Sequence, residues 1–100
     1  MPMYVVRDVF RCKPGKAKEL AARFKQLIPE MERDDGFKNG KVMVDAVADY
    51  WTVVVEAELE SLAQFETHMA EFSQRQEVRE VMAGYMELVE GGHREIYRVV

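Results

Sequence analysis

His68 is the residue of this sequence best suited to moving a proton. It lies in the segment ETHMAEF and is one of only two histidines in the chain. An imidazole changes charge near neutral pH, so it can accept a proton and return it. Apolar residues recur around it at helical spacing and place it at the edge of their stripe, which comprises Leu62, Phe65, Met69 and Phe72. Two interpretations stay open: a catalytic base at the mouth of a pocket, or a half-exposed helical residue without a role.

A second group of side chains could line a pocket for a small aromatic molecule. The candidates are Trp51, Tyr97, Phe65 and Met69. Such pockets are mostly apolar and carry only a few polar groups. The alternative is that these side chains simply fill a core, to which the methionines lend adaptable packing.

Asp8 is the acidic candidate for the pocket. It lies in the first apolar segment, MYVVRDVFRC, next to Arg7. Arg98 would be its neighbour if the first and last strands lie together. A carboxylate beside a guanidinium is usually a structural pair. Asp8 is therefore expected either in such a pair or in a catalytic role.

Other kinds of chemistry lack their motifs. The single cysteine, Cys12, excludes an internal disulfide, and no G-x-S-x-G nucleophile motif occurs. Metal-ligand spacings and glycine-rich phosphate loops are absent, so we expect no metal and no cofactor. The net charge of −4 argues against nucleic acid as a partner. No apolar run approaches the roughly 20 residues of a membrane span, and we expect a cytoplasmic protein.

The elements that must position these residues begin with a strand and a long helix. One hundred residues predict a single domain, 1–100. Residues 3–11 are rich in β-branched and aromatic side chains, which is typical of a strand. A helix is predicted to open at Pro14 and to end at Gly36, a left-handed cap. Pro29 inside this pattern predicts a kink or a fresh turn.

The rest of the chain predicts two strands, two helices and a final strand. The strands are expected at residues 37–44, 50–58 and 94–100, with a bulge at Asn39-Gly40. Ser61 with Gln64, and Ser73 with Gln76, have the spacing of capping boxes, each opening a helix. Gly91-Gly92 is expected to stop the second of these helices.

This order of elements predicts the fold class. A βαββαβ order on one four-stranded antiparallel sheet, with helices on one face, is the ferredoxin-like motif of the α+β class. The second helix is split here. The sequence therefore predicts an α+β, ferredoxin-like domain.

The predicted sheet is apolar on both faces. A sheet covered by helices on one side usually turns a polar face to water, yet Val5, Val9 and Val54 fall on the second face. Wet apolar area costs about 25 cal/mol per Å². We therefore expect a homodimer formed through the sheet faces. The charges on that face, which are Arg7 or Asp8, Glu56 and Arg98, would then pair across or within the sheet or point to its rim. The alternative is that long side chains and the chain ends shield this face.

Short motifs along nearly the whole chain resemble the dimeric α+β-barrel superfamily. They are KPGKAKEL at the start of the first helix, the DDGF segment before the second strand, and the third strand leading into ELESLAQFETHM. The chain is most similar to the antibiotic-biosynthesis-monooxygenase-like and NIPSNAP-like branches. The resemblance implies two sheets in a shared barrel, and in each protomer a pocket between the sheet and the helices.

The resemblance also implies a range of activities. The superfamily includes cofactor-independent oxygenases and isomerases acting on phenolic or quinone-like compounds, haem-degrading enzymes, and members without a known reaction. His68 matches a histidine that these enzymes carry in the helix after the third strand. The haem-degrading pattern also requires an Asn in the first strand and a Trp near the end of the third, and both are missing, so haem is not expected. A cofactor-independent monooxygenase or isomerase acting on a small aromatic compound is the leading hypothesis; a non-catalytic binding protein or a purely structural dimer is the alternative.

Overall fold

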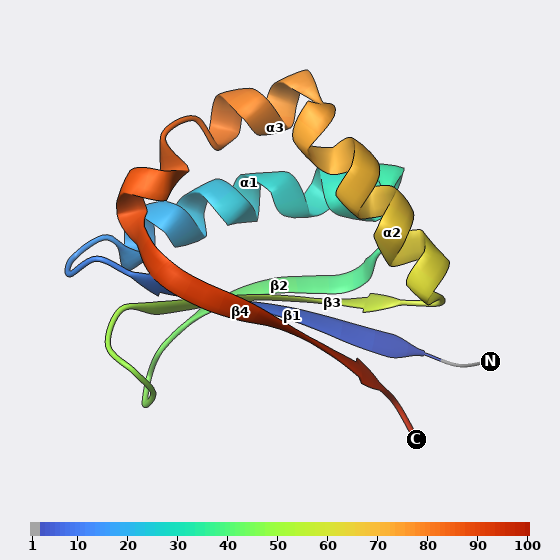
Figure 1. Ribbon diagram of the computed structural model, residues 1–100, viewed down its shortest axis with the longest axis horizontal. Coiled ribbons are helices and arrows are strands. Elements are labelled where there is room, and N and C mark those ends of the chain that lie inside the picture. Colours follow the sequence, from blue (N-terminus) through green and yellow to red (C-terminus); the bar gives the residue numbers. More distant parts are fainter. Residues whose placement is uncertain (1–2) are drawn as a thin grey trace.

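The computed structural model describes residues 3–100, which form a four-stranded antiparallel sheet with all helices on one face (Figure 1). The strands are β1 (Tyr4–Cys12), β2 (Lys38–Val44), β3 (Thr52–Leu59) and β4 (Val89–Arg98), in the order β2-β3-β1-β4. The helices are α1 (Ala17–Asp34), α2 (Leu62–Glu71) and α3 (Gln76–Val81), with 3₁₀ turns η1 (Phe72–Gln74) and η2 (Tyr85–Leu88). This is the ferredoxin-like α+β arrangement that the sequence predicts.

The core lies between the inner face of the sheet and α1. Alternate residues of β3 point inward, so Val53, Val55 and Ala57 are all buried. Leu20 of α1 belongs to the same core cluster, and both Leu20 and Leu27 are fully buried. The apolar side of α1 and the inward-facing residues of β3, both visible as periodic patterns in the sequence, therefore form one apolar layer.

The start and the continuity of helix α1 both differ from the prediction, and each difference concerns a proline. The helix starts at Ala17, and Pro14 lies in the preceding turn. Pro29 lies inside the uninterrupted helix, so no fresh turn begins there. Its ring lies on the exposed side, where the carbonyl that loses its intrahelical hydrogen bond can meet water. Gly36 adopts the predicted left-handed conformation, with φ +72°.

The second half of the chain departs further from the predicted boundaries. Ser73 does not cap a helix, because it lies in η1 and α3 starts only after Arg75, without a side-chain cap. Helix α3, which was predicted to continue to Gly91, spans only Gln76–Val81. Gly91-Gly92 lies within β4 and does not end a helix. A side chain at Gly92 would meet the Val9 carbonyl oxygen at 2.2 Å. Glycine there lets β4 approach β1 closely, a reason for strand glycines that local sequence does not display.

The helices leave the opposite face of the sheet uncovered (Figure 1), and this open face carries a charged centre. Arg7 lies between Glu56, at 2.8 Å, and Glu95, at 3.9 Å. Of the alternatives left open for the charges on this face, the structure shows Arg7 paired with Glu56 within the sheet. Val5, Val9 and Val54 stay half-buried around this centre. The face is thus a mixture of apolar side chains and compensated charges.

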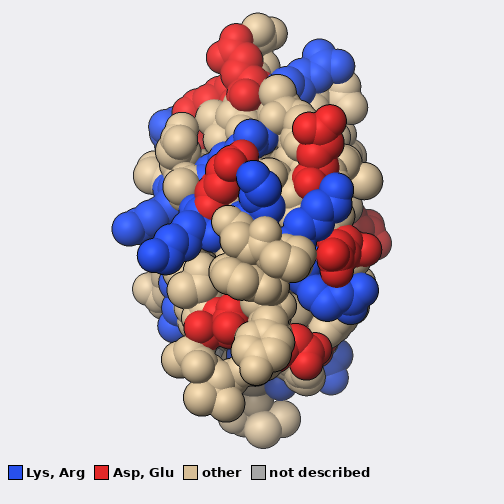
Figure 2. All heavy atoms as spheres, turned by 90° about the vertical axis from the view of Figure 1, so that its left-hand side faces the viewer, with Lys and Arg blue, Asp and Glu red and all other residues tan. Residues whose placement is uncertain are grey.

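The surface at one end of the molecule carries charges of both signs. Figure 2 shows lysine and arginine side chains interspersed with aspartate and glutamate on this side, without one sign prevailing. No helix within residues 3–100 is long and apolar enough to cross a membrane.

Candidate functional site

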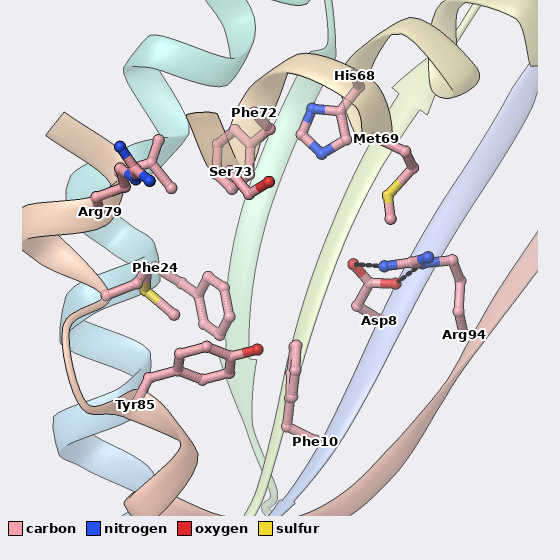
Figure 3. A pocket seen from close by; sticks show the side chains of 12 residues that line it. Asp8, Phe10, Phe24, His68, Met69, Phe72, Ser73, Arg79, Tyr85 and Arg94 are labelled. Atoms are coloured by element: carbon pink, nitrogen blue, oxygen red, sulfur yellow. Dashed lines mark hydrogen bonds and ion pairs between the residues drawn. The ribbon is translucent and has the colours of Figure 1, made fainter. Parts of the chain in front are cut away.

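A cavity of about 390 Å³ lies between the sheet and the helices (Figure 3). Its apolar walls are formed by Phe10, Phe24, Met69, Phe72, Val78 and Met82. Its polar residues come from six elements: Asp8 on β1, His68 on α2, Ser73 in η1, Arg79 on α3, Tyr85 in η2 and Arg94 on β4. Apolar walls with a few convergent polar groups are typical of a site for a small organic molecule.

His68 is the buried residue of α2, with 9% of its surface exposed. Leu62 and Met69, which the helical pattern placed at the centre of the buried stripe, are each 46% exposed. The helix is therefore rotated so that the His68 side faces the sheet. Only the packing of α2 against the sheet and α1 sets this rotation.

The two ring nitrogens of His68 have different surroundings. Nδ1 lies 2.9 Å from Oδ2 of Asp35, while Figure 3 shows the other nitrogen turned into the cavity, toward Asp8 and Arg94. An ionised carboxylate can only accept a hydrogen bond, so Nδ1 carries the proton and donates it to Asp35. In the neutral ring the lone pair is then on Nε2, where it can take a proton from a molecule in the cavity.

Asp35 is held in place by the chain around it. It follows α1, and its backbone N–H donates to the Met31 carbonyl. The left-handed turn at Gly36 then redirects the chain. From α2, the Gln64 side chain donates to the Asp35 carbonyl oxygen at 2.9 Å. This links the end of α1 to the first turn of the helix that carries His68.

Asp35 also forms a two-pronged ion pair with Arg75. Arg75 Nη2 lies 2.6 Å from Oδ1, and Nη1 lies 2.9 Å from Oδ2. Burial by itself would raise the pKa of Asp35, but the hydrogen bonds from Arg75 and His68 outweigh it, and the pKa is lowered. Asp35 therefore stays ionised at neutral pH, as the Nδ1–H form of His68 requires.

Aromatic rings hold the His68 imidazole from both sides. The ring centroids of Phe37 and Phe72 each lie 4.6 Å from its own, and that of Phe65 lies 6.2 Å away. These rings restrict the imidazole to one orientation and limit the access of water from the protein side.

Asp8 and Arg94 form an ion pair on the cavity wall. They are direct partners on β1 and β4, and Arg94 Nε donates to Asp8 Oδ1. The Arg94 guanidinium also lies over the Phe65 ring, 5.0 Å from its centroid. The expected neighbours of Asp8 are corrected by the register: Arg98 pairs with Tyr4, and Arg7 points to the opposite face.

Of the predicted pocket residues, Met69 and Asp8 line the main cavity together with His68. Phe65 lines a small adjoining cavity of about 40 Å³, which His68 also borders. Trp51 and Tyr97 lie elsewhere, which corrects their expected placement. Trp51 is in the loop before β3 with φ +62° and 43% exposed, and Tyr97 points from β4 to the open face, where its hydroxyl donates to Glu95.

Three site residues were not predicted as such: Asp35, Arg75 and Arg94. The DDGF segment pointed to Asp35 only as part of a turn, and Arg75 follows a 3₁₀ turn that no pattern revealed. The Tyr85 hydroxyl points toward the middle of the cavity in Figure 3. No signal short of the tertiary structure connects these residues to their partners, because Arg94 is 86 positions from Asp8 and Arg75 is 40 positions from Asp35.

Within residues 3–100, no group of three or more His, Cys, Asp and Glu side chains is placed to hold a metal ion. The polar groups of the cavity are instead an imidazole with an ionised partner, a phenol, a serine hydroxyl and two guanidinium groups, of which that of Arg94 is paired with Asp8. Such a set can accept a proton and stabilise negative charge on a bound molecule.

Comparison with known proteins places the chain in a family. The model of the antibiotic biosynthesis monooxygenase family matches residues 3–72. The chain therefore belongs to this family, and the expected relationship is confirmed. No curated protein shows significant similarity to it.

Solved structures share the fold over nearly the whole chain. A protein from Shewanella oneidensis is 26% identical with a TM-score of 0.75, over 97% of this chain and 90% of its own. A NIPSNAP-like domain protein from Burkholderia xenovorans is 17% identical with a TM-score of 0.81, over 98% and 85%. A Bacteroides fragilis protein, described as dimeric, of unknown function and ferredoxin-like, is 13% identical with a TM-score of 0.72, over 97% and 96%.

Proposed function

We propose that this protein is a cofactor-independent monooxygenase that binds a small hydroxylated aromatic compound in the cavity and removes an acidic proton from it with His68. The observation that carries the proposal is the His68 ring, whose Nδ1 is held by Asp35 while Nε2 faces the cavity. Family membership supports the reaction type. The site supports the class of substrate, an aromatic molecule with a removable proton.

The cavity suits such a substrate in size and polarity. Its volume of about 390 Å³ lies within the range of roughly 300–1,000 Å³ usual for small-molecule sites. Phe10, Phe24 and Phe72 offer flat apolar contacts to an aromatic ring. The Arg94 guanidinium and the Tyr85 hydroxyl are donors that can stabilise an anion formed on the ring oxygen.

The proposed reaction oxidises an activated ring CH₂ group to a carbonyl with molecular oxygen. His68 Nε2 takes a proton from the CH₂ group or its enol form, and the resulting electron-rich anion reduces oxygen and forms a C–O bond. The protonated imidazole returns the proton to the peroxide. The peroxide then loses water, so one oxygen atom remains as the carbonyl and the other leaves in water. The substrate itself supplies all the electrons.

The test compares His68→Gln with His93→Gln in an oxygen-uptake assay on a panel of hydroxylated anthrone-type compounds. We expect His68→Gln to lower kcat by about 10²–10⁴-fold, the usual contribution of a general base. His93 is exposed and lies on the sheet face away from the cavity, so His93→Gln should retain the wild-type rate. Thermal unfolding of both variants checks that the fold is kept. A His68→Gln rate within twofold of wild type would remove His68 from the mechanism.

A non-catalytic binding protein is the second candidate, and one observation favours it. Met69 and Met82 give the cavity a wall that adapts to different ligands. A carrier would bind aromatic compounds, as seen by a thermal shift, without consuming oxygen. Binding that survives in His68→Gln, with no turnover in the wild type, would support this alternative.

We further propose that the protein works as a homodimer joined through the open sheet faces. Val5, Val9 and Val54 supply apolar area there, and Arg7 and Lys41 pair with Glu56 and Glu95, so the charges at the centre of the face stay paired when it is covered. The structural relative from Bacteroides fragilis, which is described as dimeric, supports this assembly.

A further inference from the structure

We propose that Arg75 is a positioning residue for His68, acting through Asp35: it holds the carboxylate so that the imidazole keeps its proton on Nδ1 and presents a bare Nε2 to the cavity. Arg75 lies outside the cavity and touches no ligand position. The inference deepens the proposed function, and its kinetic part rests on that function. Its structural part concerns the state of the His68 ring and requires no substrate.

The geometry of the cluster gives Arg75 control over both carboxylate oxygens. Oδ2 of Asp35 accepts two hydrogen bonds, one from His68 Nδ1 and one from Arg75 Nη1, both at 2.9 Å. Oδ1 accepts only from Arg75 Nη2, at 2.6 Å. The two prongs fix the plane of the carboxylate. Rotation of that plane would move Oδ2 away from Nδ1, so the arginine determines where the imidazole finds its acceptor.

Arg75 is itself held by a second buried carboxylate. Its Nη1 also donates to Glu30 Oε1 at 3.0 Å, and Glu30 on α1 is only 3% exposed. Glu71 approaches Arg75 at 3.8 Å from the end of α2. Arg75, which lies between η1 and α3, therefore connects α1 with α2. Its extended backbone, with ψ 136°, carries the side chain back toward α1.

Charge balance gives the arginine a second effect on the imidazole. Asp35 is the carboxylate in contact with His68, and Glu30 binds the same arginine, while across the cavity Asp8 pairs with Arg94 and Arg79 adds a further cation to the lining. Without the Arg75 cation, two uncompensated carboxylates would favour a protonated imidazole. A protonated imidazole has no lone pair on Nε2 and cannot act as a base. Geometry and charge therefore act in the same direction.

The test reads the two ring nitrogens of His68 directly, by long-range ¹H–¹⁵N NMR of ¹⁵N-labelled protein at pH 7 without any ligand. The chain has two histidines, and His93→Gln assigns the signals of each. In the wild type we expect the His68 pattern of a protonated Nδ1 and a bare Nε2. In Arg75→Gln we expect a mixture of tautomers or a protonated ring, while the signals of His93 stay unchanged.

Arg75→Lys is the second test variant. It keeps the positive charge but cannot donate to both carboxylate oxygens of Asp35 in the way the guanidinium does. We expect it to keep the ring uncharged yet to mix the two tautomers. Should Arg75→Gln fail to fold, Arg75→Lys decides the question by itself. A His68 pattern identical to the wild type in the folded variants would overturn the proposal.

Kinetics then separate this inference from the proposed function. If both hold, Arg75→Gln lowers kcat about tenfold with KM within twofold of wild type, because Arg75 does not contact the substrate. If the NMR pattern changes but the wild-type protein consumes no oxygen with any compound, the proposed function fails and the positioning role stands. If kcat falls but the nitrogen pattern is unchanged, Arg75 does not act through the His68 tautomer and the inference is overturned.

Discussion

Asp35 combines two tasks at the scale of a single residue. Its side chain is 2% exposed, and a buried carboxylate is stable only when its charge is compensated and its oxygens accept hydrogen bonds. Arg75 and His68 together meet this requirement. The contacts that stabilise Asp35 in the fold are thus the same contacts that orient the His68 ring.

The lowered pKa of Asp35 predicts how stability depends on pH. A carboxyl group whose pKa is lower in the folded state stabilises the fold above its unfolded pKa, near 3.8, and loses that contribution as the pH falls through the lower, folded value. Asp35→Asn should therefore reduce the free energy of unfolding by about 2 kcal/mol at pH 7. The difference from wild type should shrink steadily below about pH 4.

Asp34→Asn is the matched control for urea unfolding at several pH values. Asp34 is exposed and pairs only with its neighbour Arg33, so we expect a much smaller change from it. A stability difference for Asp35→Asn that stays constant from pH 7 to pH 3 would contradict the assignment of Asp35 as an ionised partner.

At the scale of elements, the link between α1 and α2 determines whether Asp35 reaches His68. Ser61 caps α2 by accepting from the Gln64 N–H at 3.1 Å. The Gln64 side chain in turn accepts from the Glu60 N–H and donates to the Asp35 carbonyl. One capping glutamine therefore ties the start of α2 to the left-handed turn at Gly36.

Replacement of Gly36 tests this link. A Cβ atom at Gly36 would lie 2.6 Å from Nε2 of Gln64, so Gly36→Ala should displace that side chain as well as strain a backbone with φ +72°. Gly84→Ala has nearly the same backbone, φ +75°, with nothing within 4 Å of the new Cβ. We expect Gly84→Ala to cost about 1 kcal/mol and Gly36→Ala to cost clearly more, as measured by urea unfolding. Equal losses in the two variants would show that Gln64 does not contribute.

At the scale of the whole molecule, the open sheet face is the feature that helices leave uncovered. Its centre is charged but internally compensated, and its flanks are apolar. Covering it with a second copy would bury apolar area without isolating a charge. The cavity lies on the other side of the sheet, so assembly and substrate binding would use separate faces.

A charge placed among the apolar flanks tests the proposed assembly. The wild-type protein is expected to sediment at twice the chain mass of 11.6 kDa at micromolar concentration. Val9→Glu adds an unpaired carboxylate to the open face and should give a folded monomer, whereas Lys18→Glu on the exposed side of α1 should remain dimeric. A wild-type protein that sediments at 11.6 kDa would contradict the dimer.

Local patterns in the sequence were sufficient for the elements and the fold class. The alternation in β1 and β3, the apolar stripe of α1 and the left-handed turn at Gly36 each depend on residues within one or two turns of chain. The bulge in β2 was also predicted, and the register shift between Lys38 and Lys41 confirms it. Where the prediction was wrong, as at Ser73 and Gly91-Gly92, tertiary contacts had overridden a local signal.

The sequence by itself determined that a histidine would stand on the helix after the third strand, because residue order and helical period are local properties. The tertiary structure alone decided that this histidine is buried, that Asp35 and Arg75 fix its ring, and that Trp51 and Tyr97 lie away from it. The contacts at Asp35 join it to His68 and Arg75, which are 33 and 40 positions away. Such contacts depend on how whole elements rotate and pack, and periodicity along one element carries no information about its neighbours.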